Sequence, residues 1–208
     1  MIFYDGDDDD DPEDEPCKKE EAKGGQDGLM SRMLKARTVL VTGEVNQELA
    51  EKVISQLLLL DAASQEPIRV FITSNGGHVD SGFAIHDVMR FVKSEVISIG
   101  AGWVASIAVP ILFGAAKKEN RLSLPNTRFL IHQPSGGALG PAADIRIEAQ
   151  EILKIRAKLN EMIAEETGQT SDRIGKDSDR NFWMSAEEAK SYGLIAKVLR
   201  HANELDAK

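Results

Sequence analysis

A glycine pair at residues 76–77 is the first of three segments that could take part in acyl transfer. It follows an apolar run, in the sequence Asn75-Gly76-Gly77-His78. Adjacent glycines allow backbone N–H groups to approach a ligand closely, as an oxyanion hole requires. On its own, however, the segment is more typical of a turn between a strand and a helix.

The second segment, residues 102–108 (GWVASIA), places Ser106 at the expected start of an apolar helix. The hydroxyl would lie near unpaired backbone N–H groups and the positive end of the helix dipole, both of which favour an attacking oxygen. The N–H of Ile107 would be available to hold the resulting oxyanion. Considered alone, Ser106 is more typical of a helix N-cap.

The third segment, residues 129–137 (FLIHQPSGG), ends an apolar strand with His132 and continues into a Gly/Pro loop. A histidine at the edge of a cleft is suited to act as a general base, although a single histidine there is more often structural. The other histidines, His78, His86 and His201, lack this setting and the carboxylate neighbours of a metal site. We expect His86 on the exposed surface of a helix.

Alternating strand-like and helix-like stretches must position these three segments. Apolar runs rich in β-branched residues predict strands, and apolar residues three or four apart predict helices. The alternation is typical of an α/β fold with crossover connections. Strands are expected at residues 38–42, 68–73, 95–99, 121–124, 128–132 and 194–199, and helices at residues 46–62, 80–92, 105–113 and 142–166.

The ends of several helices are marked by their capping residues. Asn46 is placed to cap the helix that follows it. Gly168 is placed to terminate the long helix at residues 142–166. Ser185 and Glu188 match a capping box before a short helix.

The net charge of −9 belongs to the N-terminal region alone, because residues 1–27 hold twelve Asp/Glu and three Lys while the remainder is balanced. A balanced body argues against nucleic-acid binding, which needs clustered Lys and Arg. The single cysteine, Cys17, excludes an internal disulfide framework and a cysteine-based zinc site. We expect residues 1–28 to form a disordered acidic extension and residues 29–208 to form one folded domain.

No basic and apolar secretory signal opens the sequence, so we expect a cytoplasmic protein. Residues 96–116 are uncharged and long enough to span a membrane. Gly100, Gly102 and Pro110 interrupt this stretch. A buried strand followed by a buried helix is the better interpretation.

Taken together, residues 34–199 resemble the proteolytic subunit of the Clp protease, ClpP, a self-compartmentalising serine peptidase. The matching strings cover about four fifths of the chain in unbroken order. They are ITSNGG (72–77), GFAIHD (82–87), AS (105–106), LPN (124–126), IHQP (131–134), DI (144–145), EIL (151–153), TGQ (167–169) and YGL (192–194).

The resemblance implies the roles of individual residues. Ser106 would be the nucleophile and His132 the general base, while the N–H groups of Gly77 and Ile107 would form the oxyanion hole. The reaction implied is peptide-bond hydrolysis through an acyl-enzyme. No cofactor or metal is implied for this chain.

The resemblance also implies the fold and the partners. The domain 29–208 would have the ClpP/crotonase fold of repeated β-β-α units, with a protruding handle helix at about residues 142–166. Two stacked heptameric rings would enclose the active sites, and an AAA+ Clp unfoldase would thread unfolded polypeptides into the chamber. ATP would be hydrolysed by that partner, because this sequence has no phosphate-binding loop.

One position departs from the family pattern. Asn181 occupies the place of the triad aspartate, in the sequence Asp179-Arg180-Asn181-Phe182. An amide oxygen can orient the histidine but does not supply negative charge to stabilise the imidazolium. Low intrinsic activity is therefore expected. Asp179 is expected to form a surface or ring-contact salt bridge rather than to replace the missing acid.

Two alternatives remain at this point. Asn181 favours a weakly active or regulatory paralogue that works in a mixed ring with an active subunit. A crotonase-type acyl-CoA enzyme would share the fold and use paired N–H groups for a thioester oxyanion. The combination of Ser106 and His132 speaks against the second alternative.

Overall fold

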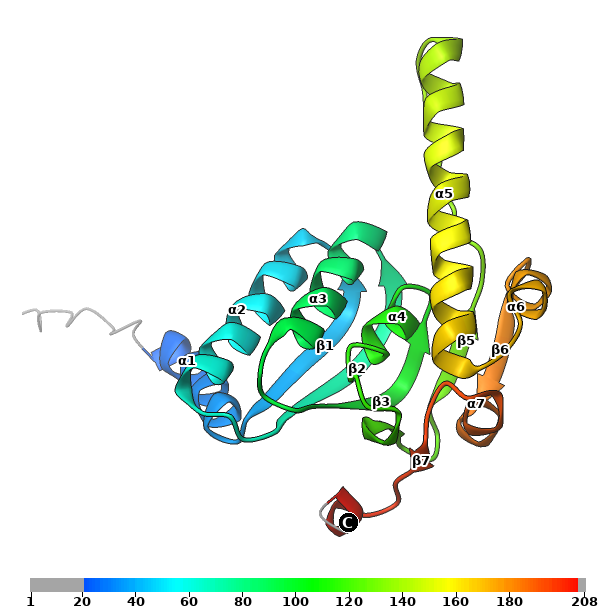
Figure 1. Ribbon diagram of the computed structural model, residues 1–208. Helices are drawn as coiled ribbons and strands as arrows, with labels where there is room; N and C mark the ends of the chain where they lie inside the picture. Colours follow the sequence, from blue (N-terminus) through cyan, green and yellow to red (C-terminus); the bar gives the residue numbers. More distant parts are fainter. Residues whose placement is uncertain (1–20, 206–208) are drawn as a thin grey trace, which may run out of the picture.

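Parallel strands connected by helices make up most of the computed structural model, which describes the backbone of residues 21–205 and the side chains from residue 28 (Figure 1). The strands are β1 (Thr38–Val45), β2 (Ile68–Gly77), β3 (Val96–Ala105), β4 (Arg121–Ser123), β5 (Arg128–Ile131), β6 (Phe182–Ser185) and β7 (Lys197–Val198). The helices are α1 (Glu21–Lys35), α2 (Gln47–Ala63), α3 (Val79–Phe91), α4 (Ala108–Leu112), α5 (Ala142–Thr167), α6 (Ser171–Asp177) and α7 (Ala186–Tyr192), with 3-10 helices η1 (Lys118–Asn120) and η2 (Ala202–Leu205).

The sheet has a branched strand order because β3 is shared between two neighbours on one side. Strands β1, β2 and β3 are parallel and lie next to one another. The first half of β3 then pairs with β4, and its last residues, Trp103–Ala105, pair with β5. Strand β7 continues beyond β4, and β6 runs antiparallel to β5. The expected α/β fold is therefore present, with six of its strands parallel.

Helices α2, α3 and α4 cover one face of the sheet (Figure 1). Burial alternates along β2, so that Ile68, Val70 and Ile72 point into the core while their neighbours are less buried. Helix α4 is buried on all sides, as its uninterrupted apolar sequence requires. The core thus lies directly beneath the strand ends that carry the three predicted segments.

The predicted helix ends are confirmed. The Asn46 side chain accepts a hydrogen bond from the Leu49 N–H and caps α2. Ser185 and Glu188 form the capping box of α7. Gly168 ends α5 in the left-handed conformation, with φ of 78°, which glycine adopts without the cost of a Cβ clash.

Helix α5 projects well beyond the rest of the chain (Figure 1). Its sequence contains no Gly or Pro, so the helix continues without a break for 26 residues. Ile145, Ile147 and Leu153, in its projecting half, are exposed apolar side chains. Leu159 and Ile163, nearer the body, are buried.

The uncharged stretch 96–116 forms β3 followed by α4, as expected. None of the helices within residues 21–205 is long and apolar enough to span a membrane. The short helix begins at Ala108 rather than at Ala105, because β3 extends to Ala105 through its pairing with β5.

The first described helix begins inside the expected acidic extension. Helix α1 starts at Glu21, eight residues ahead of Leu29, and so takes in the last part of the expected acidic extension. Residues 1–20, the rest of that extension, lie outside the described residues.

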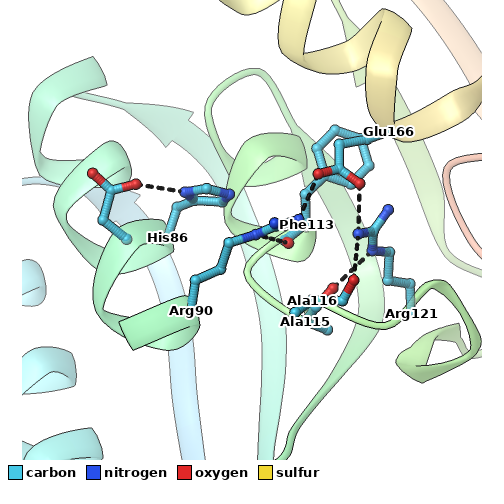
Figure 2. A network of polar contacts seen from close by, with 8 residues as sticks. His86, Arg90, Phe113, Ala115, Ala116, Arg121 and Glu166 are labelled. Carbon is cyan, nitrogen blue, oxygen red and sulfur yellow. Dashed lines mark hydrogen bonds and ion pairs between the residues drawn. The ribbon is translucent and has the colours of Figure 1, made fainter. Parts of the chain in front are cut away.

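The expectation that His86 lies on the surface is wrong. Its residue exposure is 6%, because it lies on the face of α3 that packs against α4, between Gly82, which abuts Ile107, and Met89, which abuts Gly114. The imidazole Nδ1 lies 2.8 Å from the Asp87 carboxylate, and the buried Nε2 has no hydrogen-bond partner among the described residues (Figure 2). Burial lowers the pKa of His86, and the charge of Arg90 lowers it further, whereas Asp87 and Glu166 act to raise it. The net effect is to lower the pKa of His86, so that the neutral imidazole is favoured in the folded chain.

We predict that His86 makes stability depend on pH below neutrality. Because the folded-state pKa lies below the unfolded value of about 6.5, the unfolded chain binds the extra proton first, and stability falls as the pH drops through that range. In His86→Phe the thermal midpoint should decline less steeply between pH 7.5 and 5.5 than in the wild type. The exposed His201, replaced by Gln, serves as the matched control and should keep the wild-type slope. Parallel slopes for His86→Phe and the wild type would contradict the prediction.

Candidate active site

The three predicted segments meet at one edge of the sheet. Gly76 and Gly77 end β2, Ser106 follows β3, and His132 follows β5. These strands are parallel and adjacent, so their carboxyl ends lie side by side. A backbone bond of 2.9 Å from the Ser106 N–H to the Leu130 carbonyl joins the second segment directly to the third.

Ser106 does not cap a helix. Its φ is 57°, in the left-handed region that non-glycine residues seldom occupy, and Ile107 takes the N-cap position of α4 without a side-chain cap bond. The sharp turn places the serine between the end of a strand and the start of a buried helix. Strained backbone at such a position is typical of residues held for a chemical purpose.

Gly76 and Gly77 are required for two reasons: their backbone has positive φ, and neighbouring atoms lie too close to leave room for a side chain. Gly76 has φ of 92°, and a methyl group on its α-carbon would lie 2.6 Å from Ser106 Cβ. Gly77 has φ of 147°, and the same addition would lie 2.3 Å from the Val45 carbonyl oxygen. The backbone of this segment therefore passes directly beside the Ser106 side chain. Residues larger than glycine at positions 76 and 77 would prevent this close approach.

His132 is oriented by Asn181. Nδ1 of the imidazole lies 3.2 Å from Oδ1 of the amide. Asn181 reaches this position because it precedes β6, whose first residue, Phe182, pairs with Ile131. With the amide oxygen accepting from Nδ1–H, Nε2 is left as the acceptor that a general base needs.

Asp179 does not contact His132. Its carboxylate pairs with Arg156 of α5 at 3.2 Å and with Arg180 at 3.3 Å. Asp179 therefore forms a salt bridge, as expected, and leaves Asn181 as the neighbour of the imidazole.

Ser106, Ile107 and His132 line one small cavity. Its walls are otherwise mainly apolar, formed by Val79, Pro110, Ile131, Pro134, Leu159, Asn160 and Ile163. The Ser106 hydroxyl and the His132 imidazole face the same space but are not within hydrogen-bonding distance of each other. Such a gap is common in unliganded active sites and closes when substrate binds.

Gln133 contributes to the site, although the sequence pointed to it only as part of the string IHQP. Its backbone N–H donates to the Ser178 carbonyl at 2.6 Å, and its side-chain amide donates to the Asp179 carbonyl at 2.8 Å. These two bonds attach the loop that carries Asn181 to the residue next to His132. Within the described residues, no three His, Cys, Asp or Glu side chains are grouped to hold a metal ion.

Comparison with known proteins identifies the family of this chain. A profile of the Clp protease family matches residues 21–202. The chain belongs to the Clp protease family. The ATP-dependent Clp protease proteolytic subunit 3 of Rhizobium etli is 53% identical over 81% of this chain and 87% of its own length. Subunit 2 of Pseudomonas aeruginosa is 49% identical over 85% of this chain and 88% of its own length.

Solved structures agree with the family and the fold. ClpP1 from Listeria monocytogenes is 48% identical, with a TM-score of 0.77 and coverage of 85% of this chain and 99% of the other. An Asn-to-Asp mutant of the same protein gives a TM-score of 0.79 at 49% identity, with the same coverage of both chains. The resemblance to ClpP and the ClpP fold expected from the sequence are confirmed. At the level of the family, this Clp protease chain is a serine-type peptidase subunit.

We predict that Gly76→Ala lowers peptidase turnover about 100-fold or more, the scale of losing one oxyanion donor. The added methyl group would lie 2.6 Å from Ser106 Cβ and 2.8 Å from the Ala105 carbonyl, so either the serine or the glycine segment must move. Gly28→Ala, where nothing lies within 4 Å, is the control and should keep wild-type activity. Full activity in a folded Gly76→Ala enzyme would contradict the assignment of this segment to the site.

Proposed function

We propose that this chain is the proteolytic subunit of a self-compartmentalised, ATP-dependent Clp-type serine protease that hydrolyses unfolded polypeptides in the cytoplasm. The observation that carries the proposal is that Ser106 and His132 line one cavity, with the glycine segment beside Ser106 and Asn181 bonded to the imidazole. No part of this arrangement depends on a cofactor.

The reaction begins with attack of Ser106 Oγ on the peptide carbonyl carbon. His132 Nε2 takes the hydroxyl proton as the bond forms and then gives it to the leaving amine. The N–H groups of Gly77 and Ile107 stabilise the oxyanion, the former at the close-packed end of β2 and the latter at the N-terminus of α4. Water then hydrolyses the acyl-enzyme by the same proton transfers in reverse.

Asn181 sets the level of this activity. Its amide oxygen selects the productive tautomer of His132, as a carboxylate would. It carries no charge, so the imidazolium formed during each transfer is not stabilised electrostatically. The proposed enzyme is therefore intrinsically slow, because Asn181 orients the His132 imidazole but does not stabilise its protonated form.

The proposed assembly is a pair of stacked heptameric rings with the active sites facing an enclosed chamber. The projecting half of α5, with exposed Ile145, Ile147 and Leu153, supports a contact between rings, because such side chains are normally covered by a partner. An AAA+ Clp unfoldase would supply the ATP-driven threading. The relatives named above are themselves described as ATP-dependent.

A second candidate is a regulatory subunit that contributes structure to a mixed ring with an active paralogue, and Asn181 is the observation that favours it. Membership of the Clp protease family and the bond between His132 and Asn181 favour both of these over an acyl-CoA enzyme.

We predict that Asn181→Asp raises the turnover of short fluorogenic peptides by at least tenfold. The basis is that the opposite change in another serine triad costs about 10⁴ in turnover. Asn203→Asp, an exposed position on η2, adds the same charge away from the site and should have no effect. Ser106→Ala in the Asn181→Asp background should abolish the activity. An unchanged rate in a correctly assembled Asn181→Asp protein would show that Asn181 does not limit catalysis.

Labelling with a fluorophosphonate separates the two candidates. An active subunit should form a Ser106 adduct in the purified homomeric assembly, and Ser106→Ala should remove it. Labelling that occurs only after a second Clp-type subunit is added would favour the regulatory candidate. Absence of an adduct under both conditions would contradict the role of Ser106 as a nucleophile.

A further inference from the structure

The cavity beside Ser106 is bounded by two helices that are remote in sequence. Ile107 and Pro110 form the wall on the side of α4, and Leu159, Asn160 and Ile163 form the wall on the side of α5. The space between these walls is about 20 Å³, little more than a water molecule needs. The distance between the two helices therefore decides how large a side chain the cavity accepts.

The far ends of the same two helices are joined by a cluster of charged side chains around Glu166 (Figure 2). Arg90 of α3 donates from Nε to the carbonyl of Phe113, just after α4, at 3.2 Å. Its Nη2 lies 2.5 Å from Oε1 of Glu166, near the end of α5. Arg90 thus links the end of α4 to the end of α5.

Arg121 makes a second link of the same kind. Its Nε donates to the Ala115 carbonyl at 2.9 Å and its Nη2 to the Ala116 carbonyl at 3.4 Å. Nη2 also lies 2.6 Å from Oε2 of Glu166. The two guanidinium groups therefore take one carboxylate oxygen each, and both hold carbonyls of the segment that follows α4 (Figure 2).

The charge balance of the cluster depends mainly on Glu166, the one carboxylate that is paired with both Arg90 and Arg121 among the described residues, with a weaker contribution from Glu119. Arg121 is 1% exposed, the Glu166 side chain is 17% exposed, and Arg90 is about one third exposed. Within the described part of the chain, Arg121 Nη1 already lacks a hydrogen-bond acceptor, so the cluster has no spare acceptor for it. Removing the carboxylate would leave two cations close together, one of them fully buried, which strongly favours their separation.

Glu166 lies on the helix face that forms the cavity wall. Ile163 and Leu159 precede it by three and seven residues, the spacing of one face of an α-helix. Fixing Glu166 therefore fixes the position of that wall against Pro110 and Ile107. The cluster lies outside the reacting groups and acts only through the two helices.

We propose that Glu166 is a positioning residue that sets the width of the apolar cavity beside Ser106. It thereby restricts the side chain on the acyl side of the scissile bond to small apolar groups. This inference rests on the proposed peptidase function and goes beyond it by naming what limits the substrate.

The test is a panel of fluorogenic peptides that differ only in having Ala, Met or Phe before the cleaved bond, assayed with the full assembled protein. The wild type should prefer Ala over Phe, and Glu166→Gln should shift the ratio of kcat/KM for Phe to that for Ala upward by about tenfold, mainly through KM. Arg90→Gln, which removes one link and keeps Arg121 paired, should shift it in the same direction by a smaller factor. The rate of fluorophosphonate labelling at Ser106 should change less than twofold in both.

Glu165→Gln is the matched control, because it makes the same change on the neighbouring exposed residue of α5 and should keep the wild-type preference. A wild type that prefers Phe, or folded Glu166→Gln and Arg90→Gln enzymes with the wild-type ratio, would overturn the inference. If Glu166→Gln does not assemble, the ratio in Arg90→Gln decides. Failure of the proposed function is recognised separately, since then no peptide is cleaved in a Ser106-dependent manner.

Discussion

The geometry of the candidate active site depends on the pairing of β3 with two different strands, β4 and β5, along the same edge. Its first half pairs with β4 and its last residues pair with β5, so β5 begins alongside the end of β3 rather than alongside its start. The Ser106 N–H then finds its partner in the Leu130 carbonyl, two residues before His132. Because β2 lies on the opposite side of β3, the glycine segment reaches the same serine. One arrangement of parallel strands thus brings together Ser106, His132 and the glycine segment, for which we propose the roles of nucleophile, base and oxyanion donor.

Much of this arrangement is local enough to be read from the sequence. The helix caps at Asn46, Gly168 and Ser185 follow from residue type and position, and the alternation of elements predicts the fold class. The conformation of Ser106 is different, because a small polar residue before an apolar run satisfies the pattern of an N-cap equally well. In the structure the Ser106 N–H is bonded instead to the Leu130 carbonyl, on a strand more than twenty residues away, and the serine adopts a left-handed turn.

The burial of His86 also could not be predicted from the sequence. A polar residue on an amphipathic helix reads as exposed, and nothing in the sequence near α3 says which helix will cover it. The cover comes from α4, which packs against the face of α3 on which His86 lies. The charged cluster was missed for the same reason, since Arg90, Arg121 and Glu166 are separated by tens of residues and share no motif.

Helix α5 connects the exterior of the subunit to the cavity wall. The helix runs without Gly or Pro from exposed Ile145 to buried Ile163. A tilt of its projecting half would therefore also move the residues that line the cavity, unless the C-terminal end of the helix is fixed. Apolar packing alone allows sliding, because it has no preferred direction. The two charged links at Glu166 are directional and lie beyond the cavity, so they fix the end of the helix. If Glu166 positions the cavity wall as we propose, a contact on the projecting half would act on the cavity by bending α5 against this fixed end.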